Sequence, residues 1–210
     1  MSLPVFLVNG GPVLWIILLV GAVAMAVFVE RLLHLHRAQI NTVEFLNGVR
    51  NVLRRDNVVE AISICDATPG PVARLVKTAI LSRDRGRERV REAIEEAGLA
   101  EVPRLEAKLN LLATISQIAP LLGLLGTVLG FINVFEQMQQ AGPYAHIGQL
   151  SYGVWQALIC MAAGLALAVP CYAGYNYLVS RVNAVVLDME RAATEIVNIV
   201  TEPHGNNKSA

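Results

Sequence analysis

The sequence predicts an all-α membrane protein with three transmembrane helices, two of them long and continuing into a helical cytoplasmic domain. Of its 210 residues, 54% are hydrophobic and 16% are charged, whereas about a quarter of the residues of a soluble domain are usually charged. Three apolar runs are each long enough to cross a bilayer. Lys and Arg balance Asp and Glu at 17 each, so no basic excess indicates nucleic acid as a partner. This composition argues against a soluble enzyme.

The three predicted crossings are residues 12–29, 109–135 and 153–179. The first run holds no charged residue and would span about 27 Å as a helix. A secretory signal would carry basic residues before its apolar stretch, but residues 1–11 contain no Lys or Arg. We therefore expect the first run to remain as an anchor. The other two runs contain no Asp, Glu, Lys, Arg or His.

The distribution of basic residues predicts the orientation of the chain. Residues 30–110 hold fourteen Lys and Arg and residues 180–210 hold the other three. Lys and Arg that flank a crossing are retained on the cytoplasmic side. We therefore expect a periplasmic N-terminus (1–11), a helical cytoplasmic domain (30–108), a periplasmic loop (136–152) and a cytoplasmic C-terminus.

Within the cytoplasmic domain, apolar residues at three- and four-residue spacing predict a helix over residues 42–65. Pro and Gly at residues 69–71 then predict a turn, followed by helices over about 72–82 and from about 87 to 97. The alternating charges of the last helix indicate a solvated face.

Two helices are predicted to pass through the membrane and continue beyond it. Pro103 can occupy the first turn of a helix, and apolar residues lead from it into the second crossing without a break. After the third crossing, residues 180–200 hold a helical apolar stripe that needs an apolar partner. We expect one helix from about 148 to 200, followed by a disordered tail over 201–210.

Small residues line one face of each of the last two crossings. In lipid such residues let backbones approach, and so they mark helix interfaces. In the second crossing they are Ser116, Pro120, Gly123, Thr127 and Gly130, with Gly126 and Gly130 as a GxxxG pair. In the third they are Gly153, Ala157, Cys160, Gly164, Ala168, Cys171 and Gly174. Two such faces exceed what a helical hairpin requires, so we expect an oligomer.

Each of these crossings also contains a proline, Pro120 or Pro170, which removes one backbone hydrogen bond and can bend the helix. A fixed kink and a hinge are both compatible with it. Among the few polar residues of the runs, Gln156 stands out because an amide in hydrocarbon needs a partner. We expect its side chain to face protein or water.

The second crossing resembles the signature of the ExbB/TolQ/MotA family of inner-membrane motor subunits. The matching residues read APLLGLLGTVLG over 119–130, followed by Phe135. Residues 153–176, GVWQALICMAAGLALAVPCYAGYN, are similar to the third transmembrane helix of that family. The resemblance covers nearly the whole chain and is closest to the ExbB and TolQ branch, because MotA-like members carry four crossings.

The resemblance implies a bacterial inner-membrane protein that forms a pentameric ring around helices of an ExbD- or TolR-like partner. In the family an aspartate of the partner takes and releases protons, and their passage drives motion. The position that matches the family threonine is Thr127. Gln156 occupies the usual glutamate position and Met161 that of a second threonine, so both replace polar groups of other members. These three residues are the candidates for lining the ion pathway.

None of the three runs contains a side chain that titrates near neutral pH. Glu30, Glu136 and His146 lie at or beyond the predicted membrane edges, where we expect them to be solvated. If the protein moves protons, the titrating group must therefore come from another chain. No cofactor or metal is expected: Cys65, Cys160 and Cys171 are widely spaced and suit packing, and His34 and His36 suit the lipid headgroups.

Our leading hypothesis is a proton-driven motor subunit that energises work in the periplasm or outer membrane. Nutrient uptake, envelope maintenance and gliding all fit the sequence equally well. Gln156 and Met161 favour the alternative, a non-conducting or Na⁺-dependent ring scaffold of the same fold. An enzyme site in the cytoplasmic helices lacks support, because that region has no Ser/His/Asp set, phosphate loop or metal-spaced cluster.

Overall fold

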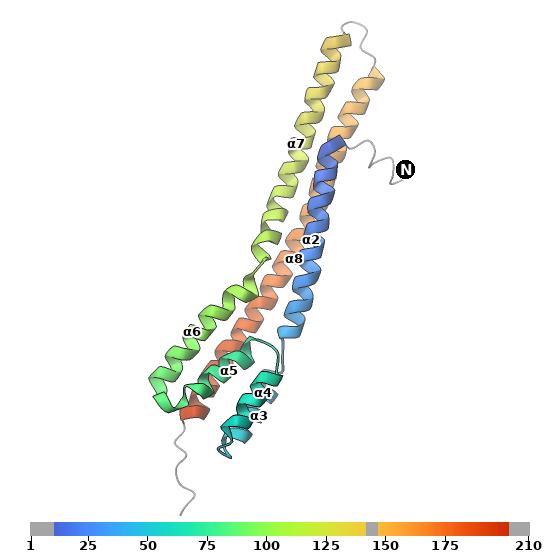
Figure 1. Ribbon diagram of the computed structural model, residues 1–210. Helices are drawn as coiled ribbons and strands as arrows, with labels where there is room; N and C mark the ends of the chain where they lie inside the picture. Colours follow the sequence, from blue (N-terminus) through green and yellow to red (C-terminus); the bar gives the residue numbers. More distant parts are fainter. Residues whose placement is uncertain (1–10, 142–146, 202–210) are drawn as a thin grey trace, which may run out of the picture. The chain divides into compact units, whose positions relative to one another are not determined.

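A computed structural model describes residues 11–141 and 147–201, and every element in that part of the chain is helical (Figure 1). The elements are α2 (Gly11–Ala38), α3 (Thr42–Leu53), α4 (Val58–Ala67), α5 (Pro71–Leu81), the short 3-10 helix η1 (Arg83–Arg85), α6 (Arg87–Glu106), α7 (Leu109–Ala141) and α8 (Ile147–Thr201). Three helical stretches, which include α2, α7 and α8, are long and apolar enough to cross a membrane. The predicted fold class is confirmed. The predicted N-terminus before Gly11 and the tail after Thr201 lie outside the described residues.

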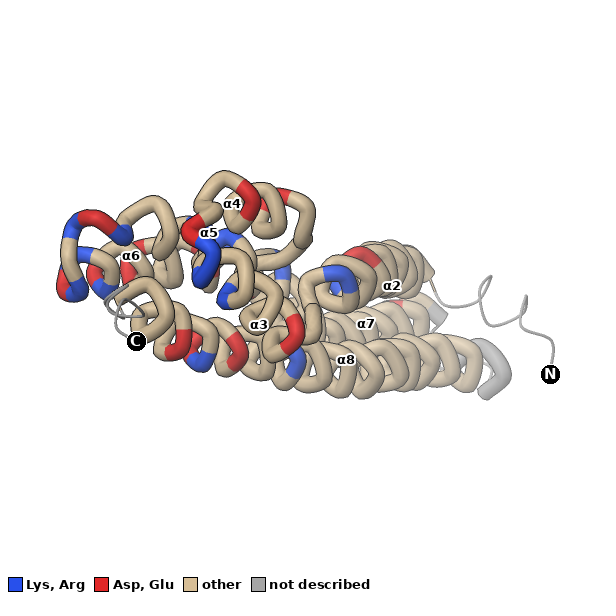
Figure 2. The backbone as a smooth tube through the Cα atoms, turned by 90° about the horizontal axis from the view of Figure 1, so that it is seen from below, with Lys and Arg blue, Asp and Glu red and all other residues tan. Residues whose placement is uncertain are grey.

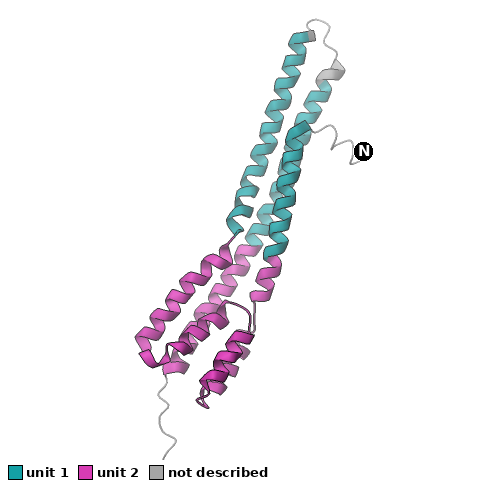
Figure 3. Cartoon of the chain, in the orientation of Figure 1, with its two compact units in different colours: residues 1–31, 108–177 teal, residues 32–107, 178–210 magenta. Residues whose placement is uncertain are grey.

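The chain divides into two compact units (Figure 3). Unit 1 comprises residues 1–31 and 108–177, and unit 2 comprises residues 32–107 and 178–210. Figure 2 shows that Lys, Arg, Asp and Glu gather on α3 to α6 and on the later turns of α8, whereas most of α7 and the first half of α8 carry none. The apolar crossings therefore belong to unit 1 and most of the charge to unit 2.

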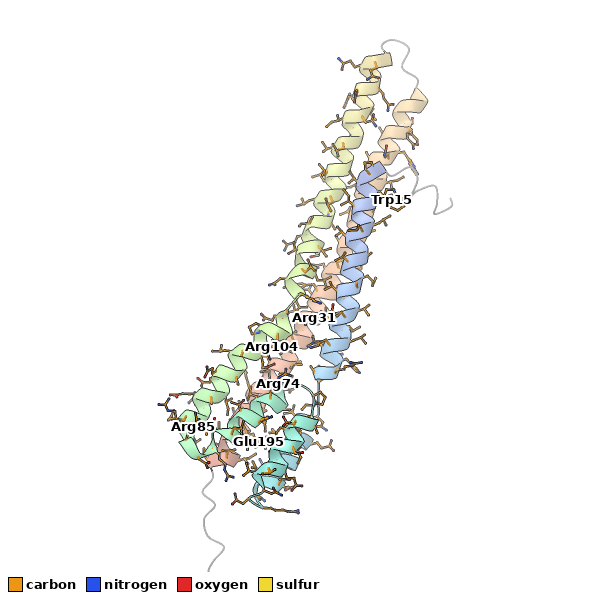
Figure 4. The ribbon with its side chains drawn as sticks, viewed as in Figure 1. Trp15, Arg31, Arg74, Arg85, Arg104 and Glu195 are labelled. Atoms are coloured by element: carbon orange, nitrogen blue, oxygen red, sulfur yellow. The ribbon has the colours of Figure 1, made fainter. Side chains whose placement is uncertain are left out.

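Unit 1 contains most of α2, all of α7 and the first half of α8. Many of its large apolar side chains point outward, including Trp15, which is 61% exposed on α2 (Figure 4). A soluble protein rarely exposes so many contiguous apolar groups. In a bilayer, this surface is in contact with lipid or with other helices.

Unit 2 is built around α5, whose side chains are buried on almost every face. Helix α5 packs against α4 and α6, and α3 packs against α4. The second half of α8 contributes a regular buried stripe at alternating four- and three-residue spacing, as the sequence predicts. The buried residues of this stripe are Leu178, Val182, Val185, Met189, Ala192, Ile196 and Ile199.

The helix predicted over 42–65 is two helices, α3 and α4. Residues 54–57 separate them, and Asp56 has a φ of 55°. The side chain of Asn57 accepts a hydrogen bond from the backbone N–H of Glu60 at 3.3 Å, which caps the start of α4. Asn41 and Glu44 repeat this arrangement at the start of α3. The prediction followed the apolar spacing and missed the second N-terminal cap.

The prediction that a helix begins at Pro103 and enters the second crossing without a break is wrong. Helix α6 begins at Arg87 and holds Pro103 in its interior. It ends at Glu106, and two non-helical residues, Ala107 and Lys108, precede α7. The sequence offers no Gly or Pro at this point, which is why periodicity alone predicted continuity.

All three cysteines are buried. Burial raises the pKa of the Cys65 thiol to about 11, with Asp66 raising it further and Lys77 lowering it. Because the thiolate is the reactive form of cysteine, Cys65 is inert at neutral pH. This agrees with the interpretation of the cysteines as packing residues.

A buried carboxylate joins α5 to α6. The side chain of Glu101 is 8% exposed and accepts hydrogen bonds from Nε of Arg74 at 2.9 Å and from Nη1 of Arg104 at 3.0 Å. The two arginines, labelled in Figure 4, remain largely exposed. Arginine thus compensates the carboxylate for the water that it loses on burial.

We expect Glu101→Gln to lower the free energy of unfolding by about 1–2 kcal/mol, because two charge-assisted hydrogen bonds become neutral ones. The matched control is Glu92→Gln, whose exposed pair with Arg89 should contribute less than about 0.5 kcal/mol. Thermal unfolding in detergent, followed by circular dichroism, measures both. Equal losses in the two variants would contradict this role for Glu101.

Candidate functional site

Helices α7 and α8 approach each other closely in unit 1 at three glycines. A Cβ atom built on Gly164 would lie 2.6 Å from the carbonyl oxygen of Ala119. One built on Gly123 would lie 3.0 Å from the carbonyl oxygen of Cys160, and one on Gly130 2.8 Å from the Cβ of Ala157. Only a residue without a side chain permits such contact, so the predicted small-residue faces of the two helices pack on each other.

Helix α2 joins this contact at Gly126. A Cβ on Gly126 would lie 2.6 Å from the Cβ of Cys160 and 3.1 Å from a methyl group of Val13. Around this point an apolar cluster is formed by Val13, Leu14, Ile17, Ile159 and Cys160, with Leu122, Ala163 and Leu167 packed against it. The three helices of unit 1 therefore share one core.

Thr127 lies half-buried between α7 and α8. Its hydroxyl group donates to the carbonyl oxygen of Gly123 at 3.0 Å and lies 3.2 Å from that of Ala157 on α8. A hydroxyl group has one proton, which these two carbonyls share, and two acceptor positions. Towards any further group, Thr127 can therefore act only as an acceptor while this arrangement holds.

Gln156 is half-buried, and its side chain lies against the start of α2. A Cβ on Gly11 would lie 2.3 Å from the Nε2 atom of Gln156, and Gly11 has a φ of 67°. The amide group thus faces protein of its own chain. This placement agrees with the expectation that an amide in an apolar helix turns towards protein or water.

Met161 is also half-buried, and its backbone faces Gly123 at the contact between α7 and α8. Pro120 and Pro170 lie inside α7 and α8, both of which remain helical through them. Each proline leaves one carbonyl group without its helical N–H donor. A difference between a kink and a hinge is not expressed in these helices, so both readings of the prolines stay open.

The structure brings Thr127, Met161, Gly123, Gly126, Gly130 and Gly164 together and places Gln156 at the α2 end of the same unit. Other polar residues of the crossings lie on exposed surfaces. They are Thr114, Gln117, Asn133 and Asn176. Exposed amides within apolar helices need water or another chain as a partner, so these positions favour further contacts beyond this chain.

An ion pair that sequence reasoning missed joins Glu30 on α2 to Lys108, immediately before α7. Glu30 was expected to be solvated, and its side chain is 55% exposed but paired. Arg31, next to it, is only 7% exposed (Figure 4). The available signal was that oppositely charged residues flank the ends of two crossings.

The described residues include no group of three or more His, Cys, Asp or Glu side chains placed to hold a metal ion. The apolar runs of α2, α7 and α8 contain no carboxylate, amine or imidazole. The fold and this site define a helical membrane protein whose crossings pack through small residues around one threonine.

Comparison with known proteins identifies the family. The model of the MotA/TolQ/ExbB proton channel family matches residues 67–191. An ExbB homologue of Methanothermobacter thermautotrophicus is 26% identical over 83% of this chain, which spans 62% of that protein. The biopolymer transport protein ExbB of Neisseria gonorrhoeae is 27% identical, over 93% of this chain and 96% of its own length. The Tol-Pal system protein TolQ of Haemophilus influenzae is 35% identical over 48% of this chain and 43% of its own.

The chain belongs to the MotA/TolQ/ExbB family. The resemblance stated from residues 119–130 and 153–176 is thereby confirmed. The family is one of channel proteins of the membrane, and the apolar helices of unit 1 agree with this.

We expect Gly164→Ala to separate α7 from α8, because its methyl group would meet the backbone oxygen of Ala119, which cannot move independently of its helix. The melting temperature in detergent should fall by several degrees, which corresponds to about 1–3 kcal/mol of overpacking. The control is Gly48→Ala on α3, where nothing lies within 4 Å of the new atom. Gly48→Ala should be neutral or stabilising, and an unchanged melting temperature for Gly164→Ala would contradict the close contact.

Proposed function

We propose that this chain is the ring-forming subunit of an ion-driven motor in the bacterial inner membrane. In this proposal, the ring couples proton flow to mechanical work in the periplasm or outer membrane through an ExbD- or TolR-like partner. The partner crosses the membrane once and supplies an aspartate. The chain itself acts as a transport subunit and not as an enzyme.

The observation that carries the proposal is the contact of α7 and α8 around Thr127, in a chain of this family. The backbones approach at Gly123 and Gly164, and Thr127 places a hydroxyl oxygen among apolar side chains. A polar atom kept at such a place is typical of a functional position in a membrane.

The proposed topology follows the basic residues. We place the crossings at residues 12–29, 109–135 and 153–179, with the N-terminus in the periplasm and unit 2 in the cytoplasm. Helix α7 continues to Ala141, so the proposed periplasmic segment of 136–152 begins in helical form. The outward-facing apolar side chains of α2, α7 and α8 would contact lipid and neighbouring copies in a homo-oligomer, for which we propose a pentamer.

The ion would be handled by the partner, because the three crossings contain no titrating side chain. Thr127 donates its hydroxyl proton to backbone carbonyls, so its free lone pairs can accept a hydrogen bond from water or from a protonated carboxyl group. In this role Thr127 orients the species that carries the proton and does not carry it.

We expect the ring to conduct protons only with its partner, and Thr127→Ala to slow that flux by about tenfold, the loss of one hydrogen bond of about 1 kcal/mol or slightly more. Thr127→Ser keeps the hydroxyl group and is the matched control. The measurement uses vesicles with a pH-sensitive dye, containing the chain alone or with the partner. Size-exclusion chromatography checks that each complex remains assembled.

Two results would overturn this proposal. One is proton flux through rings that lack the partner, since the chain would then handle the ion alone. The other is partner-dependent work that persists after a protonophore has collapsed the gradient.

A second candidate function is a ring scaffold of the same fold that conducts Na⁺ or no ion. It is favoured by Gln156 and Met161, which stand where the resemblance leads us to expect more polar side chains. The amide of Gln156 lies against Gly11 of its own chain, an arrangement that serves packing as well as conduction.

Gln156→Glu separates the two candidates. In a conducting ring we expect the new carboxyl group to give the flux an additional pH dependence, because it titrates and the amide does not. Gln137→Glu, at an exposed position on α7, is the control and should leave the profile unchanged. Ion flux that does not respond to Gln156→Glu at any pH would favour the scaffold.

A further inference from the structure

The joint between α6 and α7 consists of two residues whose backbone leaves the helix. Ala107 has φ −51° and ψ 140°, which is an extended conformation. Lys108 follows with a φ of 63°, in the left-handed region. The carbonyl oxygen of Lys108 then accepts the N–H of Leu112 at 3.4 Å, and α7 begins.

The local sequence opposes this break. Residues 104–109 read RLEAKL, and all of these residue types are strong helix formers. A lysine in the left-handed region is sterically strained because of its Cβ atom. Pro103 does not account for the break, because a proline disturbs the turn before it and not the turn after it. A tertiary contact must therefore stabilise the break.

The contact is the ion pair between Nζ of Lys108 and Oε1 of Glu30 on α2. It belongs to the one residue of the joint that carries the strained dihedral angle, and both partners lie in unit 1. Among the described residues, Asp56 is the other non-glycine residue with positive φ. Asp56 lies in a turn between two helices, and aspartate tolerates this region better than lysine does.

The joint also lies where the chain passes between the two units, at residues 107 and 108. The other two passages, at residues 31–32 and 177–178, lie inside the uninterrupted helices α2 and α8. Of the three connections, the one through Ala107 and Lys108 is thus the one able to change its local conformation at the cost of few hydrogen bonds.

We propose that the Glu30–Lys108 ion pair is a latch for a conformational switch. With the latch closed, Lys108 is left-handed and α6 and α7 are separate. With the latch open, Ala107 and Lys108 become helical and residues 87–141 form one continuous helix. The switch goes beyond the proposed function, since it requires neither an ion nor a partner.

A distance between spin labels on α6 and α7 tests the switch. Labels at Ala100 and Gln117, both exposed, would be about 25 Å apart along a continuous helix and closer across the break. The three buried cysteines are replaced by alanine, and labelled chains are diluted with unlabelled ones so that each assembly carries one labelled copy. The distance distribution then gives the ratio of continuous to broken forms.

The variants separate the strain from the charge. Lys108→Ala removes the cation but keeps a Cβ atom, and Glu30→Gln removes the anion, so both should raise the ratio of continuous to broken forms at least threefold. Lys108→Gly also removes the cation but relieves the strain, so the broken form should persist. Glu106→Gln, an exposed carboxylate beside the joint, is the control and should match the unchanged chain.

Exchange of the two charges completes the test. The double variant with Glu30→Lys and Lys108→Glu should restore the broken form that Glu30→Gln loses. The proposal is overturned if Lys108→Ala and Lys108→Gly give the same distances, if the double variant behaves as Glu30→Gln does, or if the unchanged chain is already continuous.

Discussion

The close approach of α7 and α8 is the constraint on which the rest of unit 1 depends. Without water in the hydrocarbon layer, apolar side chains gain little by meeting each other, and helices associate through backbone contact. Gly164 against Ala119, and Gly123 against Cys160, supply that contact. It brings the Thr127 hydroxyl to a carbonyl of the neighbouring helix and leaves room for α2 to pack at Gly126. The position of the candidate site is therefore a consequence of which residues have no side chain.

The separation of charge between the two units restricts the chemistry of the chain. Ion pairs and hydrogen-bonded charges lie in unit 2 or at the ends of the crossings, as with Glu101 and Glu30. Between those ends, polar groups are hydroxyls and amides that do not titrate near neutral pH. A pathway built from this chain alone can orient a proton carrier but cannot bind and release the proton. Membership of a channel family thus makes a second chain a physical requirement of the proposed motor.

Much of this architecture could be predicted from the sequence because it follows from composition and spacing. The three apolar runs, the long helix α8 and the small-residue faces all express local rules. The split of residues 42–65 was predictable in principle from Asn57 and Glu60, which form an N-terminal cap. The direction of Gln156 towards Gly11 and the pairing of Glu30 with Lys108 were not, because each joins residues far apart in the chain. The break at Lys108 was also hidden, since its local sequence favours a helix.

The energies at that break explain why it suits a switch. A non-glycine residue in the left-handed region costs about 1–2 kcal/mol, and a partly exposed ion pair contributes about 0.2–1 kcal/mol. These opposing terms are similar in size, so neither conformation of Lys108 is favoured by a wide margin through them alone. Because about 1.4 kcal/mol changes an equilibrium tenfold, a modest change in the surroundings of Glu30 is sufficient to redistribute the two forms. A break fixed by glycine or proline would lack this sensitivity, because it would be present whether or not the ion pair formed.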